Sequence, residues 1–168
     1  MNPAAPAIET ERLRIVPLTP PQLALWTEDL PRLEAELACR YDAEPVEGLF
    51  RDIVRGQAQK AAQAPRDYLW HTFWFLVRKS DAVVVGAIDF KDVPSPVGEV
   101  EIGYGLGKPY EHQGYMTEAV RAFCDWALAQ PGVRHVIAET DLDGLASQAI
   151  LRRCGFAPTT RAETAWRL

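Results

Sequence analysis

The sequence has little cysteine and little histidine, with 3 residues of each type among its 168. The cysteines, Cys39, Cys124 and Cys154, form neither an even set nor a CxxC pair, so they predict neither a disulfide framework nor a zinc site. We expect all three to be reduced thiols. The histidines are equally scattered and lack the spacing of metal ligands. The sequence therefore predicts no bound metal.

Basic residues and long apolar runs are also scarce. The chain has 18 Lys+Arg against 23 Asp+Glu, a formal charge of -5, which argues against a nucleic-acid binder with a broad basic face. No apolar run approaches the roughly 20 residues needed to cross a bilayer. Residues 1–10 lack a basic start followed by an apolar stretch. These absences predict a cytoplasmic protein without nucleic-acid or membrane partners.

Length and composition predict one folded domain. A chain of 168 residues is about one domain long by the usual range of roughly 100 to 200 residues per domain. With 48% hydrophobic and 24% charged residues, it can bury a core and has too little charge bias to be disordered. We expect a single domain over residues 1–168, with the Ala- and Pro-rich residues 1–7 disordered.

The hydrophobic pattern predicts an α/β (α+β) domain. Strand-like segments rich in β-branched and aromatic residues cover residues 13–17, 72–77, 83–90, 99–106, 133–140 and 164–168. Helical periods cover residues 20–37, with a break at Pro31, and residues 46–62, 116–127 and 146–154. This order of strands and helices favours a mixed sheet.

A glycine-containing loop, Gly107-Lys-Pro-Tyr-Glu-His-Gln-Gly114, leads from the strand at residues 99–106 into the longest helix. A loop that enters a helix points unpaired N–H groups at one spot, and the helix dipole adds positive charge there, so the loop predicts phosphate binding. It is neither a Walker loop nor a GxGxxG fingerprint, which disfavours nucleotide hydrolysis and nicotinamide chemistry. The alternative is that its glycines merely permit a tight turn.

Four short blocks of sequence follow one another in a characteristic order. They are Thr10-Glu-Arg-Leu-Arg14 with Leu18-Thr-Pro-Pro21, Glu101-Ile-Gly-Tyr-Gly-Leu106, Gly114-Tyr-Met-Thr-Glu-Ala119, and Ser147 followed by Cys154-Gly-Phe156. In this order they resemble the GNAT N-acetyltransferases, within them the RimJ/RimL-like branch. The resemblance implies a GNAT fold, whose mixed, mostly antiparallel sheet is flanked by helices. The strands ending at Leu106 and Thr140 then splay apart, with acetyl-CoA between them.

The resemblance also implies where acetyl-CoA binds. In the family, amides of the loop before the long helix hold the CoA pyrophosphate in the pattern Gln or Arg, two residues, Gly, one residue, Gly or Ala. This sequence reads Glu111-His-Gln-Gly114-Tyr-Met116, in which Gly114 alone agrees strictly. Glu111 brings a carboxylate near the phosphates and Met116 adds bulk, whereas the backbone donors are unchanged. The implied cofactor-binding residues are Tyr104, Leu106, Glu111, His112, Gln113, Gly114, Tyr115, Met116, Thr117, Gly144 and Ser147.

Two residues are candidates for catalysis. Acetyl transfer requires a neutral amine, so a base must take a proton. Glu101 fits this role because it lies on the carboxylate and glycine face of its strand and matches a position where several GNAT enzymes place a base. Ser147 matches a family serine near the CoA sulfur, where it stabilises the thiol. The alternatives are a solvated carboxylate or a partner of Arg12 or Arg14 for Glu101, and a helix cap for Ser147.

Two positions depart from the family pattern beside these candidates. Gly144 lies three residues before Ser147, where the family usually has an Asn that bonds the pantetheine arm or nearby backbone. Leu151 lies where many members carry the Tyr that protonates the sulfur. The sequence therefore assigns no general acid.

The resemblance implies an N-acetyltransferase that uses direct attack of a primary amine on the thioester. A covalent intermediate on Cys124 or Cys154 is disfavoured because neither has a partner His at recognisable spacing. The alternatives are an acyl-CoA-binding sensor without turnover and an interaction protein that has lost CoA binding. The acceptor is a small-molecule or peptide amine, and the acidic balance favours a cationic one. A homodimer is common in this branch.

Overall fold

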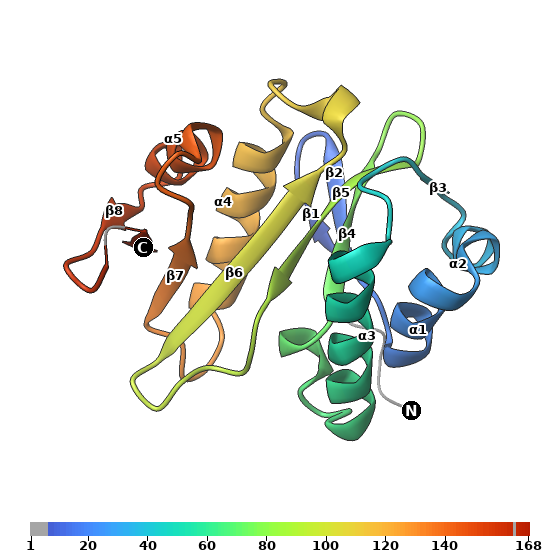
Figure 1. The fold of residues 1–168 in the computed structure, drawn as a ribbon, viewed down its shortest axis with the longest axis horizontal. Helices are drawn as coiled ribbons and strands as arrows, with labels where there is room; N and C mark the ends of the chain where they lie inside the picture. Colours follow the sequence, from blue (N-terminus) through green and yellow to red (C-terminus); the bar gives the residue numbers. More distant parts are fainter. Residues whose placement is uncertain (1–6, 163) are drawn as a thin grey trace.

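The computed structural model describes residues 7–162 and 164–168. One sheet runs through the molecule and carries helices on both faces (Figure 1). The prediction of disorder at residues 1–7 lies outside the described residues, except for Ala7.

The strands form one mixed sheet, in the order β1-β2-β4-β5-β6-β7-β9-β8, with β3 paired to β5. Their bounds are β1 Ile8–Glu9, β2 Leu13–Pro17, β3 Arg40–Tyr41, β4 Phe73–Arg78, β5 Val83–Phe90, β6 Glu99–Leu106, β7 His135–Glu139, β8 Ala157–Pro158 and β9 Ala165–Arg167. Two of the pairings, β3 with β5 and β6 with β7, are parallel and the others are antiparallel. The mixed, mostly antiparallel sheet expected from the sequence is confirmed.

The helices also lie where the sequence predicts them. Their bounds are α1 Pro20–Glu28, α2 Leu30–Leu37, α3 Gly48–Gln63, α4 Tyr115–Leu128 and α5 Leu145–Arg153, with 3-10 turns η1 Tyr68–Trp70 and η2 Lys108–Tyr110. The prediction of two short helices is confirmed, but the break between them lies at Asp29 and not at Pro31. Asp29 ends α1 with its N–H and caps α2 with its side chain, which accepts from the Arg32 N–H. Pro31 follows in the first turn of α2, where a missing N–H costs nothing.

Three short strands are absent from the sequence prediction. They are β1, β3 and β8, each two residues long. A two-residue strand has no hydrophobic period, and each of these forms because a longer strand offers it a free edge.

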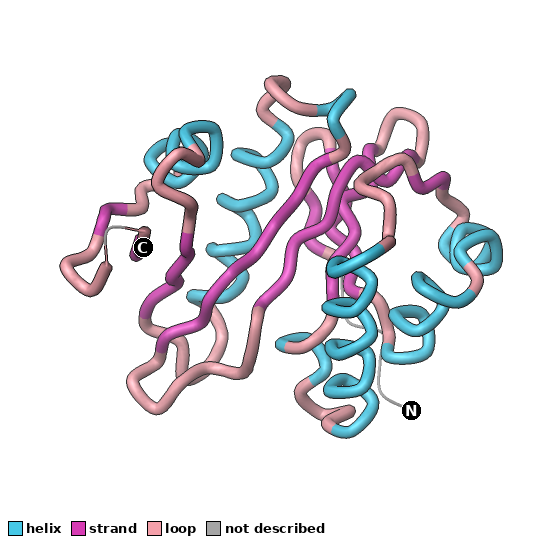
Figure 2. The backbone as a smooth tube through the Cα atoms, viewed as in Figure 1, coloured by secondary structure: helices cyan, strands magenta, loops and turns pink. Residues whose placement is uncertain are grey.

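The strands lie between helices on either side (Figure 2), and the sheet divides two apolar cores. One face packs against α4 and α5, with Phe90 stacked on Phe123 at 4.1 Å between ring centroids. The other face packs against α1, α2 and α3, where Trp26 contacts Phe73 and Phe75 edge-on. Because both faces are covered, every residue of β5 is buried.

The sheet opens between β6 and β7, as predicted. The two strands pair in parallel from Glu99 and His135 to Ile102 and Ala138, and the pairing then stops while β6 continues to Leu106. In Figure 1, β6 and β7 lie together at the lower left and separate toward the top. The splay therefore leaves the end of β6, from Gly103 to Leu106, without a neighbouring strand on the β7 side.

Candidate active site

A cavity of about 640 Å³ occupies this opening, and we call it the helix-side cavity. Its walls come from the end of β6, the loop into α4 and the face of α5. The lining residues are Tyr104, Gly105, Leu106, Glu111, His112, Gly114, Tyr115, Met116, Thr117, Leu145, Ala146, Ser147, Ala149, Ile150 and Arg153.

A second cavity of about 340 Å³ lies on the sheet face that carries α3, and we call it the sheet-face cavity. It is lined by Tyr41, Ala43, Glu44, Phe50, Ile53, Phe73, Ala87, Asp89, Lys91, Ile102, Gly103, Tyr104, Gly105, Glu139 and Ser147. Apolar side chains of α3 and β4 and carboxylates of the sheet thus share its walls.

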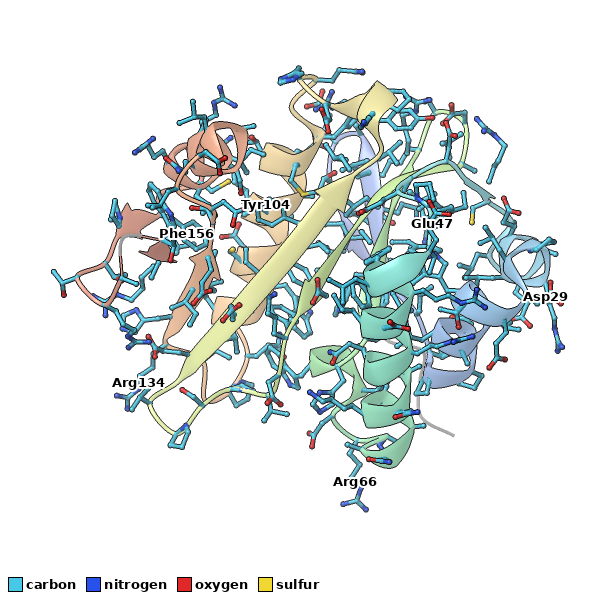
Figure 3. The ribbon with its side chains drawn as sticks, viewed as in Figure 1. Asp29, Glu47, Arg66, Tyr104, Arg134 and Phe156 are labelled. Atoms are coloured by element: carbon cyan, nitrogen blue, oxygen red, sulfur yellow. The ribbon has the colours of Figure 1, made fainter. Side chains whose placement is uncertain are left out.

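The two cavities meet at Tyr104 and Ser147, which line both of them. Tyr104, labelled in Figure 3, comes from β6, and Ser147 comes from α5. Their hydroxyl oxygens are 2.5 Å apart in a hydrogen bond that crosses the splay. Burial raises the pKa of the Tyr104 phenol, whereas the bond to Ser147 opposes the shift. The phenol is therefore protonated at neutral pH and has a proton to donate.

The loop before α4 presents backbone donors to the helix-side cavity. His112 and Gly114 both have left-handed backbone conformations, with φ of 62° and 82°. Among the described residues, none accepts a hydrogen bond from the amides of residues 112–117. These free amides and the dipole of α4 favour an anion at this end of the cavity.

The turn between β1 and β2 holds this loop in place through Glu118. Its carboxylate accepts hydrogen bonds from Thr10 Oγ1 at 2.6 Å, from the Arg12 N–H at 2.9 Å and from Arg12 Nε at 2.9 Å. Arg12 Nη1 also donates to the Gln113 carbonyl at 2.9 Å, and its guanidinium lies 4.2 Å from the centre of the Tyr115 ring. Burial acts to raise the pKa of Glu118, but these donors lower it overall. The carboxylate therefore stays charged.

Asp89 is the buried carboxylate of the sheet-face cavity. It lies in β5 opposite Gly103 and is 9% exposed. Burial raises its pKa to about 6, against the opposing charge of Lys91, and nearby Glu101 adds to the rise. Within the described residues its carboxylate makes no hydrogen bond or ion pair. A cavity-lining carboxylate with these properties can accept a proton near neutral pH.

The structure brings most of the residues predicted to bind the cofactor into one cavity. Those lining the helix-side cavity are Tyr104, Leu106, Glu111, His112, Gly114, Tyr115, Met116, Thr117 and Ser147. Gln113 lies outside its walls and donates from its side chain to the Pro109 carbonyl at 3.0 Å. Gly144 also lies outside them, as the residue before α5.

Glu101, the base expected from the sequence, lines neither cavity. Its carboxylate is 3.7 Å from Lys91 Nζ, whereas Arg12 and Arg14, the alternative partners, pair with Glu118 and Glu9. Sequence reasoning missed Asp89, although a single carboxylate within the apolar segment at residues 83–90 was a usable signal.

Neither a metal centre nor a membrane-spanning helix is found among the described residues. They contain no group of three or more His, Cys, Asp or Glu residues placed to hold a metal ion. None of the helices in residues 7–162 and 164–168 is long and apolar enough to span a bilayer.

The chain is similar to several known proteins. Residues 12–157 match the family profile described as the acetyltransferase (GNAT) domain. The uncharacterized N-acetyltransferase YjdG of Bacillus subtilis (strain 168) is 34% identical over 83 residues, a match that spans 49% of each chain. A ribosomal-protein-S5-alanine acetyltransferase from Vibrio fischeri has a TM-score of 0.66 at 16% identity, over 97% of this chain and 94% of its own.

A third relative has been solved with a ligand. It is RimL, a ribosomal L7/L12 alpha-N-protein acetyltransferase in complex with coenzyme A, with a TM-score of 0.65 at 14% identity over 96% of this chain and 97% of its own. At these identities the two structural likenesses show a shared fold.

Proposed function

The chain belongs to the GNAT acetyltransferase family, whose donor is acetyl-CoA, and we propose that it acetylates a primary amine by direct attack of the amine on the thioester. One observation carries this proposal. Two cavities meet at the hydrogen-bonded pair of Tyr104 and Ser147, and one of them holds the buried carboxylate of Asp89. The donor and the acceptor amine can thus approach the same point from opposite sides.

The helix-side cavity fits acetyl-CoA. The free amides of residues 112–117 suit a pyrophosphate, and the unpaired edge of β6 beyond Ile102 suits an amide-bearing arm. Arg153 also lines this cavity and adds a positive charge for a phosphate of the cofactor. Glu111 is exposed, so its side chain can point to solvent while its neighbours bind. Acetyl-CoA supplies the acetyl group as a thioester.

Asp89 takes the role of base in place of Glu101. The attacking amine forms the new C–N bond, and its proton passes to Asp89, the cavity carboxylate whose pKa lies near neutrality. Glu101 lies outside both cavities and its charge is matched by Lys91. It therefore acts on the reaction through the pKa of Asp89.

Tyr104 and Ser147 act on the leaving group. As the C–S bond breaks, Tyr104 donates its proton to the departing sulfur, and Ser147 holds the phenol in position through their 2.5 Å hydrogen bond. The Ser147 role expected from the sequence is thereby joined to an acid that the sequence did not assign. After product release, Asp89 gives its proton to solvent and solvent returns a proton to the phenol, so both groups are restored for the next turnover.

A covalent intermediate on cysteine is disfavoured. Burial raises the pKa of both Cys124 and Cys154, and neither thiol lines either cavity. A buried thiol with a raised pKa is a poor nucleophile at neutral pH.

Thermal unfolding and thiol release together test the proposal. A saturating excess of acetyl-CoA, about 100-fold over Kd, should stabilise the fold by about 2.7 kcal/mol, and a panel of primary amines should include one that releases CoA thiol. Stabilisation with no thiol release across the panel would support an acyl-CoA sensor. No stabilisation at all would overturn the cofactor site.

A further inference from the structure

The sheet-face cavity has an excess of carboxylates. Glu44, Asp89 and Glu139 line it, and Lys91 is its one lining residue with a positive charge. That charge is shared with Glu101, which lies outside the cavity with its carboxylate 3.7 Å from Lys91 Nζ. In the described part of the chain, Glu44 and Glu139 have no cationic side chain within ion-pair distance. The cavity is thus built for more than one positive charge.

Two of these carboxylates, Asp89 and Glu44, lie beside successive glycines of β6 that face the cavity. A Cβ atom on Gly103 would be 2.9 Å from Asp89 Oδ1, and one on Gly105 would be 3.4 Å from Glu44 Oε2. The two glycines are alternate residues on one face of the strand, so their positions differ by about 7 Å along it. Asp89 is nine-tenths buried and without a hydrogen bond, and Glu44 lies toward the exposed mouth.

The walls between the two carboxylates are apolar. Phe50 and Ile53 of α3 and Phe73 of β4 line the same cavity. Tyr41 fixes the backbone position of Glu44, because its hydroxyl donates to the Glu44 carbonyl at 2.5 Å. A short hydrocarbon chain with a cationic group at each end matches this arrangement of charges and walls.

We infer that the acceptor carries a second cationic group besides the amine that is acetylated, and that Glu44 binds it. The inference rests on the proposed function, in which Asp89 faces the reacting amine. Glu139 is the less suitable partner because it projects from β7, across the splay, and also lines a neighbouring cavity under β8 and β9. The substrate class is therefore a diamine with a short apolar spacer, and an acceptor with a carboxylate at that place is disfavoured.

The test compares a four-carbon diamine with butylamine as acceptors, by acetyl-CoA-dependent thiol release. The wild type should favour the diamine in kcat/KM by about ten- to a hundredfold, the range of a hydrogen bond to a charged group. The preference should shrink as salt screens the charges. Glu44→Gln should lose the preference, because kcat/KM should fall far more for the diamine than for butylamine. Glu47→Gln, an exposed carboxylate outside both cavities, is the matched control and should keep the preference.

The outcomes separate the inference from the proposed function. Equal use of both amines by the wild type, or a preference that survives in Glu44→Gln, would overturn the inference and leave the acetyltransferase activity standing. Loss of the preference in Glu139→Gln, with Glu44→Gln unaffected, would overturn the assignment to Glu44. Silence of the wild type with these amines and with the wider panel would overturn both proposals.

Discussion

Arg12 and Glu118 form an ion pair across 106 positions of the chain, with Arg12 Nε 2.9 Å from Glu118 Oε1. The pair joins the turn between β1 and β2 to the first turn of α4. The same guanidinium holds the carbonyl of Gln113, just before the helix begins. The shape of the loop with the free amides therefore depends on a residue 101 positions earlier in the chain.

Replacement of Arg12 should weaken binding of acetyl-CoA more than it slows chemistry. Arg12→Ala removes the bonds to Glu118 and Gln113, so the loop loses its fixed shape and KM for acetyl-CoA should rise about tenfold, as expected for loss of a charge-assisted contact. Steady-state kinetics over a range of acetyl-CoA concentrations measure this. Arg14→Ala is the control because Arg14 is exposed and pairs with Glu9. A fall in kcat at unchanged KM would contradict the positioning role.

Asp89 and Glu101 can be distinguished as candidate bases by matched variants. Asp89→Asn should lower kcat/KM by about 10²- to 10⁴-fold, the usual contribution of a general base, and Glu101→Gln should lower it far less. In the wild type, kcat/KM should rise with pH through an apparent pKa of about 6, because the carboxylate accepts a proton only when ionised. Asp89→Asn should lack this rise of kcat/KM with pH.

If Asp89 is the base, Asp89→Asn must lose more kcat/KM than Glu101→Gln. A larger loss in Glu101→Gln than in Asp89→Asn would restore Glu101 as the base. Measurements with one amine acceptor at saturating acetyl-CoA keep the ionisation of the acceptor the same for both variants.

The parts of this fold that sequence predicts are those with a local period. Residues 99–106 alternate apolar and polar, and α4 has a clear apolar stripe, so both were predicted nearly to the residue. Asp89 lies in β5, which is buried on both faces and shows no alternation that would mark it as facing a cavity. The contact of Glu118 with Arg12 depends on tertiary packing alone, so no local pattern shows it.

The resemblance to a family located residues that local patterns could not. Ser147 and Tyr104 were both expected near the cofactor, and the structure adds that their hydroxyls share a hydrogen bond. That bond depends on the splay of β6 from β7 and on where α5 packs against the sheet. Both are set by tertiary structure and not by local sequence.

Tyr104→Phe and Ser147→Ala should each lower kcat with little change in KM for acetyl-CoA. A loss of roughly 10- to 100-fold is expected for Tyr104→Phe because the leaving sulfur loses its proton donor. The double variant should be no slower than the worse single variant, since both remove the same hydrogen bond. Rates of thiol release for the three variants measure this. Losses that multiply would show that the two hydroxyls act independently.

Burial of Asp89 should also cost the protein stability in a pH-dependent way. The pKa of Asp89 is raised from 3.8 to about 6, so between these values the folded chain holds a proton that the unfolded chain has released. The free energy of unfolding should therefore fall as the pH rises through this window and then level off. Asp89→Asn removes the ionisation, so the variant should exceed the wild type by on the order of 2–3 kcal/mol at about pH 8, and the gain should vanish toward pH 4.

Denaturant unfolding of the wild type and Asp89→Asn across this pH range measures the difference. Asp52→Asn, an exposed carboxylate on α3, reports the effect of the same substitution at the surface. A stability gain in Asp89→Asn that stayed the same at every pH would mean that Asp89 is not held with a raised pKa. A gain that appears only above the window, in a variant that has lost activity, would show that the buried carboxylate is retained for catalysis at a cost in stability.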